Sequence, residues 1–106
     1  MMLDPKLKRG LLEVCVLSAL AKGESYGYKI IRDLSDCVDV SESTLYPILR
    51  RLESAGHLTE RSMEHNGRLR KYYQLTDIGR ERIAQFINDW QSISTVYEYV
   101  KEEFQR

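Results

Sequence analysis

Side chains that form hydrogen bonds or carry positive charge gather between residues 41 and 71. A segment with helical spacing provides hydroxyl, aromatic and guanidinium groups, and a basic segment follows it; the main members are Ser43, Thr44, Tyr46, Arg50, Arg68, Arg70 and Lys71. Hydroxyl and guanidinium groups can bond to base edges, and cations neutralise phosphates. These residues therefore favour binding of a nucleic acid over a covalent reaction.

The remaining residues offer no competing chemistry. His57 and His65 have no companions at metal-ligand spacing, and a zinc site needs three or four converging ligands. We find no nucleophile–base set, no paired carboxylates and no phosphate-binding loop. We therefore expect no enzyme, no metal and no other cofactor.

Composition indicates one globular domain, since the chain has 106 residues of which 30% are charged. The formal net charge is zero, yet residues 41–71 hold six Lys/Arg against four Asp/Glu. Two cysteines, Cys15 and Cys37, are too few for a secreted disulfide scaffold, which favours a reducing, cytoplasmic location. No apolar run approaches the roughly 20 residues that cross a bilayer, so no membrane partner is expected.

The first half of the chain predicts helices. Asp4 followed by Pro5 is typical of a helix start, and this helix should cover residues 4–22. Between residues 11 and 20 it is apolar on nearly all sides, and a domain of this size offers only one covering face. We therefore expect a second subunit to cover the other side.

Two shorter helices should follow. Ser25 is expected to cap a helix that ends near Leu34, with Tyr26 on its inner face. Ser41 is expected to cap a third helix that Gly56 ends, with an apolar face formed by Leu45, Ile48, Leu49 and Leu52.

The second half predicts a hairpin and a long helix. Residues 58–63 and 70–75 read as strands around an Asn66-Gly67 turn. Thr76 should cap the last helix, whose apolar residues recur at alternating steps of three and four: Ile83, Phe86, Trp90, Ile93, Tyr97, Val100 and Phe104. Such a heptad seam predicts a helix–helix interface, which Leu11 of the first helix should join.

The order helix, helix, helix, strand, strand, helix predicts a mainly α fold with a small β-hairpin. This is a winged helix-turn-helix, here residues 1–75, followed by a C-terminal dimerisation helix, residues 76–106. Helix 4–22 should contribute to the dimer as well. The same fold also serves as a protein-interaction module without sequence-specific DNA binding, and the zero net charge leaves that alternative open.

The chain also resembles the PadR family of bacterial transcriptional regulators, particularly its small members with one C-terminal helix. Matching segments are residues 25–30, 43–53, 55–58 and 67–79, including Thr44-Leu45-Tyr46-Pro47 and Arg70-Lys71-Tyr72-Tyr73. The resemblance implies a homodimer that binds a palindromic operator on double-stranded DNA, usually as a repressor. It places the DNA contacts at Tyr28, Lys29, Ser43, Thr44, Tyr46, Pro47, Arg50, Arg68, Arg70 and Lys71.

Trp90 lies on the predicted seam, where interface packing alone explains an aromatic residue. The chain also resembles a multidrug-binding branch of the family, in which a Trp at the matching place stacks planar aromatic compounds between subunits. That resemblance implies a ligand pocket lined by Leu12, Cys15, Val16, Ala19, Trp90, Ser94 and Tyr97.

Overall fold

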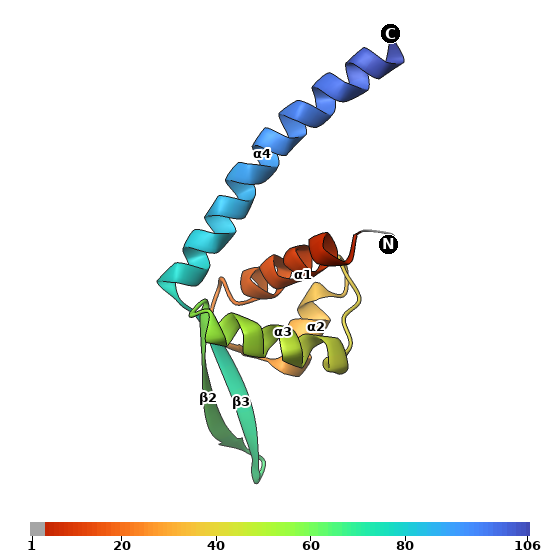
Figure 1. The fold of residues 1–106 in the computed structure, drawn as a ribbon. Helices are drawn as coiled ribbons and strands as arrows, with labels where there is room; N and C mark the ends of the chain where they lie inside the picture. Colours follow the sequence, from red (N-terminus) through yellow and green to blue (C-terminus); the bar gives the residue numbers. More distant parts are fainter. Residues whose placement is uncertain (1–3) are drawn as a thin grey trace.

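The computed structural model describes residues 4–106, and it has the expected class of mostly helices with a small antiparallel sheet (Figure 1). Residues 1–3 of the predicted first unit lie outside the described part. No helix in residues 4–106 is long and apolar enough to cross a membrane. In chain order the elements are α1 (Pro5–Ala19), β1 (Ser25–Tyr26), α2 (Gly27–Leu34), α3 (Glu42–Ser54), β2 (Leu58–His65), β3 (Arg68–Leu75) and α4 (Asp77–Gln105).

Three of the helices begin at the residues that the sequence indicates. Asp4 Oδ2 accepts hydrogen bonds from the backbone N–H groups of Lys6 and Leu7, both at 3.1 Å. At α3, Ser41 Oγ accepts from the Thr44 N–H at 3.3 Å. At α4, Thr76 Oγ1 accepts from the Gly79 N–H at 3.0 Å. Each cap satisfies an N–H that the first helical turn leaves without a partner.

The predicted cap of the second helix is wrong. Ser25 and Tyr26 form strand β1, which pairs antiparallel with Tyr73 and Tyr72 of β3, and α2 begins only at Gly27. The sheet therefore has three strands in the order β1-β3-β2 instead of a hairpin alone. Pairing with a distant strand overrides the local capping preference of Ser25, and leaves Tyr26 half-buried at the sheet instead of in the helix core.

The hairpin turn is confirmed, and its strands are longer than predicted. Asn66 and Gly67 have φ values of 51° and 78°, the left-handed backbone that a two-residue type I′ turn requires. The register then pairs His65 with Arg68 and continues to Leu58 opposite Leu75. We call this β2–β3 hairpin the wing.

A single core joins α1, α2, α3 and the base of the sheet. Its fully buried side chains come from α1 and its C-cap, from α2, from α3 and from β2, and they include Leu17, Leu20, Ile30, Leu45, Leu49, Leu52 and Leu58. The helix α3 runs on through Pro47, with its apolar face on this core. The core thereby fixes which face of α3 is turned to solvent.

Helix α4 packs its first turns against α1 and then leaves the body of the protomer (Figure 1). Every residue after Phe86 is exposed, and the molecule measures 64 Å in its longest direction against 27 and 21 Å in the others. An exposed helix this rich in apolar side chains lacks a covering partner within the protomer.

An ion triad links three helices at the point where α4 meets the body. Glu13 of α1 accepts from Arg51 Nε of α3 at 3.1 Å and from Arg82 Nη2 of α4 at 2.7 Å. Burial alone would raise the pKa of Glu13, but hydrogen bonds from Arg82 and Arg51 outweigh burial and hold this pKa below 4.5. The carboxylate is therefore favoured in the folded state.

Replacing Glu13 by glutamine should destabilise the fold in a pH-dependent way. At pH 7 we expect Glu13→Gln to lower the free energy of unfolding by about 1–2 kcal/mol, because charged hydrogen bonds are lost between groups that are only partly screened. Because the pKa of Glu13 is lower in the folded state than in the unfolded state, its carboxylate stabilises the fold when the pH is above the unfolded pKa. The difference in unfolding free energy between the two proteins should therefore shrink as the pH falls below about 4.5 and through the folded pKa.

Urea unfolding of both proteins between pH 7 and pH 3 measures this difference. Glu98→Gln is the matched control, since Glu98 is exposed and forms no ion pair within residues 4–106. A stability difference that stays constant with pH would contradict the role of the triad.

Candidate nucleic-acid interface

Helix α3 presents hydrogen-bonding groups on the face opposite its core contacts. Leu45, Leu49 and Leu52 are buried, whereas Ser43, Thr44 and Arg50 are exposed. Arg50 forms no ion pair within residues 4–106, so its guanidinium is free to meet an anion. A helix with this exposed face can bond to base edges or phosphates.

The hydroxyls at the start of α3 are held together. Ser41 Oγ lies 3.0 Å from Ser43 Oγ and donates to Thr44 Oγ1 at 3.1 Å. The same Ser41 oxygen caps the helix. Two of the predicted contact residues are therefore orientated by the N-cap before any ligand arrives.

The first turn of α2 and the middle of α3 pack closely because Gly27 lacks a side chain. A Cβ atom at Gly27 would lie 2.7 Å from the Tyr46 hydroxyl oxygen. This close approach leaves Tyr46 half-buried between the two helices, while Tyr28 remains 66% exposed beside them. A glycine at the start of a helical pattern, such as Gly27, is the signal in the sequence for such close packing.

A groove runs between these helices and the wing, with a volume of about 850 Å³. Five of the predicted contact residues line it together: Tyr28, Tyr46, Arg68, Arg70 and Lys71. The other five do not line it. Ser43, Thr44, Pro47 and Arg50 lie on α3, where Pro47 and Arg50 border a separate hollow, and Lys29 faces a third hollow beside α1.

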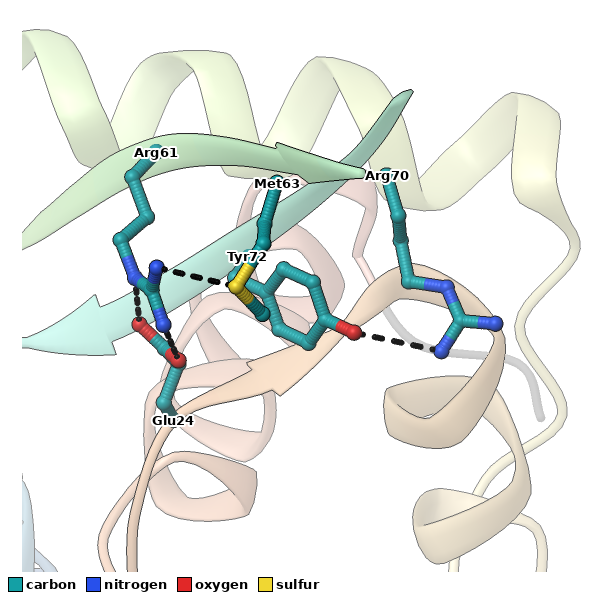
Figure 2. Close-up of polar contacts among 5 residues, drawn as sticks. All are labelled: Glu24, Arg61, Met63, Arg70 and Tyr72. Carbon is teal, nitrogen blue, oxygen red and sulfur yellow. Dashed lines mark hydrogen bonds and ion pairs between the residues drawn. The ribbon is translucent and has the colours of Figure 1, made fainter. Parts of the chain in front are cut away.

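The cations of the wing fall into two groups. Arg61 is bound by both carboxylate oxygens of Glu24, at 2.6 and 2.5 Å (Figure 2), and Lys71 lies 3.6 Å from Glu60. Hydrogen bonds from Arg61 lower the pKa of Glu24, and Glu24 raises that of Arg61. Within residues 4–106, Arg68 and Arg70 form no ion pair.

Sequence reasoning missed the side chains that hold the wing. Glu24 and Tyr26 come from the segment around β1, and Arg61 and Tyr72 are opposite each other in the hairpin register. The cross-strand pair follows from the Asn66-Gly67 turn and could have been predicted. The role of Glu24 could not, because it depends on β1 lying beside β3.

The α1–α4 junction has two neighbouring grooves of about 390 and 420 Å³, both lined by Leu11, Val14 and Phe86. Trp90 lines one of them and stacks on Phe86 at a ring-centroid distance of 6.1 Å. Cys15 and Ala19 line the other, which the free thiol of Cys37 also borders.

The remaining residues of the predicted ligand pocket lie elsewhere. Leu12 and Val16 belong to the protomer core, have 8% and 0% of their surface exposed, and line neither groove. Ser94 and Tyr97 are exposed farther along α4 and line neither groove. Because α1 is apolar on nearly all sides, its inward and outward faces could not be separated by sequence pattern alone.

The predicted seam follows the uncovered face of α4. Ile83 and Phe86 of α4 and Leu11 of α1 are half-buried where the two helices meet. The outer members of the seam are exposed: Trp90, Ile93, Tyr97, Val100 and Phe104. Ile87, Val96 and Tyr99 are exposed as well, which makes the apolar face wider than a strict two-position seam.

Within residues 4–106, no group of three or more His, Cys, Asp or Glu residues could hold a metal ion.

These features define a winged helix-turn-helix protein with an exposed basic groove and a projecting helix. Residues 16–85 match the model of the transcriptional regulator PadR-like family. The chain belongs to this family, and it is accordingly a transcriptional regulator and not an enzyme.

Individual relatives agree with that assignment. The negative transcriptional regulator PadR of Bacillus subtilis is 32% identical over 99 residues, which cover 89% of this chain and 53% of that protein. The structure of a PadR family transcriptional regulator from Eggerthella lenta has a TM-score of 0.81 at 34% identity, covering 92% of this chain and 87% of the other. Bacillus subtilis PadR in complex with operator DNA has a TM-score of 0.67 at 28% identity, covering 73% of this chain and 46% of that one.

Proposed function

We propose that this regulator is a homodimeric repressor that binds a palindromic operator and is released by a planar aromatic ligand at the α1–α4 junction. The observation that carries DNA binding is the groove between α2, α3 and the wing, which collects Tyr28, Tyr46 and three wing cations on one surface. The similarity to Bacillus subtilis PadR, whose structure was solved with operator DNA, supports the same use of this surface.

In this proposal α3 enters the major groove and the wing follows the adjacent backbone. The exposed hydroxyls and Arg50 are the groups on α3 that face DNA, and Arg68 near the wing tip neutralises a phosphate. A chain with zero net charge lacks a general attraction to DNA. These local cations therefore have to supply the electrostatic part of the free energy of DNA binding.

Dimerisation is inferred from the exposed apolar face of α4. Ile93, Tyr97 and Val100 are each more than half exposed, at 53%, 56% and 57%. Burial of apolar surface against a second copy of the same helix would stabilise the pair by roughly 25 cal/mol per Å² of apolar area. A two-fold dimer presents two copies of α3, which makes a palindrome the matching operator.

The proposed ligand site rests on the two apolar grooves beside Phe86 and Trp90. A planar aromatic compound could extend the stack that these two rings already form. Because the grooves lie between α1 and α4, a bound ligand would favour one relative position of these helices over another.

DNA binding should weaken with salt, and the exposed wing cation Arg68 should contribute one phosphate contact to that dependence. Arg68→Ala should lower affinity for the operator and reduce the slope of log K against log salt by about 0.9, the contribution of one phosphate contact. Fluorescence anisotropy with a duplex selected from a random library by the wild-type protein measures both quantities.

Arg106→Ala is the control, because Arg106 lies at the end of α4 far from the wing and should change neither quantity. An unchanged slope for Arg68→Ala would contradict the phosphate contact. Failure of the wild-type protein to enrich any duplex, together with recovery of a stable protein partner, would favour the protein-interaction alternative.

Dimerisation predicts a sharp difference between two faces of α4. Ile93→Asp places a charge on the seam and should shift the protein to monomers, whereas Thr95→Asp introduces the same charge on the polar face, one heptad from Asn88 and Glu102, and should leave a dimer. Sedimentation equilibrium measures the oligomeric state. A wild-type protein that remains a folded monomer at micromolar concentration would refute the proposed interface.

Ligand binding can be followed through Trp90, the only tryptophan in the chain. A planar aromatic effector should quench its fluorescence over the same concentration range in which it releases the selected duplex. Trp90→Leu should lower the sensitivity of release to the ligand while leaving DNA binding without ligand close to wild type. Release without quenching would place the effector site elsewhere.

A further inference from the structure

Arg70 differs from the other wing cations in how it is held. Its guanidinium carbon lies 4.1 Å from the centre of the Tyr26 ring and 5.9 Å from that of Tyr72. Its Nη1 is 3.4 Å from the Tyr72 hydroxyl (Figure 2). No carboxylate pairs with it within residues 4–106, so a positively charged group is fixed in direction without being neutralised.

The two tyrosines are themselves fixed by neighbouring contacts. Tyr26 meets Tyr72 edge to face, with ring centroids 5.7 Å apart and an interplanar angle of 71°. The guanidinium carbon of Arg61 lies 5.6 Å from the centre of the Tyr72 ring. The same guanidinium donates two hydrogen bonds to the carboxylate of Glu24, in the loop before β1. Figure 2 shows Arg61 and Arg70 on either side of Tyr72.

This arrangement leaves most donors of Arg70 available in the groove. Arg70, Tyr26 and Arg68 all line the groove that faces α2 and α3. A guanidinium that stacks on aromatic rings keeps its planar edge of N–H donors, and it loses less freedom on binding than an unrestrained side chain. A planar fork of this kind suits bidentate contacts, of which the guanine edge is the commonest base partner.

We propose that Arg70 is a specificity-determining residue that contacts a base edge, and that Tyr26 and Tyr72 position it. Arg68, in contrast, is exposed and unrestrained, and acts as a charge on the backbone. This inference rests on the proposed DNA-binding function and assigns the two free cations of the wing to different tasks.

The test compares two DNA duplexes rather than one. The wild-type protein selects a duplex from a random library, and a scrambled duplex of the same composition serves as the non-specific probe. Arg70→Lys keeps the charge but removes the planar fork. It should weaken binding to the selected duplex by about tenfold and leave the affinity for the scrambled duplex unchanged. The slope of log K against log salt should also stay unchanged, because the charge is kept.

The positioning role has its own matched pair of variants. Tyr26→Leu removes the ring beneath Arg70 and should reproduce the loss of discrimination, whereas Tyr26→Phe keeps the ring and should behave like the wild type. Circular dichroism and thermal unfolding confirm that each variant is folded. If Tyr26 had a purely structural role, Tyr26→Leu would instead weaken binding to the selected and the scrambled duplex by the same factor.

The outcomes separate this inference from the function on which it rests. If the wild-type protein selects no duplex, the proposed function itself is wrong. If it selects a duplex and Arg70→Lys keeps the full preference for that duplex, Arg70 is not a specificity determinant. If Arg70→Lys loses the preference and Tyr26→Leu keeps it, the aromatic stack does not position Arg70.

Discussion

The carboxylate of Glu13 is the constraint on which the relative placement of the helices depends. It lies on α1 and binds Arg51 of α3 and Arg82 of α4, so that one partly buried charge joins three helices at a single point. Only 12% of the Glu13 side chain is exposed, which makes loss of either partner more costly than loss of a surface pair. Helix α3, which we propose faces DNA, and the projecting helix α4 therefore share an anchor on α1.

That shared anchor has a consequence for the proposed regulation. A ligand can shift a protein only between states for which it has different affinities. The grooves beside Phe86 lie between α1 and α4, close along the chain to Glu13 and Arg82. A displacement of α4 there would act on the same residue that holds α3, without a long pathway through the core.

Local signals in the sequence were sufficient where one residue decides the backbone. Asp4, Ser41 and Thr76 start helices, and Asn66-Gly67 forms the turn, because each satisfies a requirement set by its immediate neighbours. Contacts between distant segments were not predictable in this way. Strand β1, the Glu24–Arg61 pair and the Glu13 triad each join residues that are far apart in the sequence, and hydrophobic periodicity gives no information about such pairs. The burial of Leu12 and Val16 was not predictable either, because it depends on packing against distant segments.

Because positive and negative charges balance in this molecule, side chains with a fixed orientation are important for the proposed DNA recognition. The net charge is zero, and two of the wing cations, Arg61 and Lys71, are already paired with Glu24 before β1 and with Glu60 of β2. Such a protein has a weak long-range field, and salt would screen that field within about 8 Å at physiological ionic strength. The proposed preference for one DNA sequence then has to come from short, directional contacts, and these require donors whose direction is set in advance. The tyrosines around Arg70 meet that requirement with ring contacts, which orientate a cation without neutralising it.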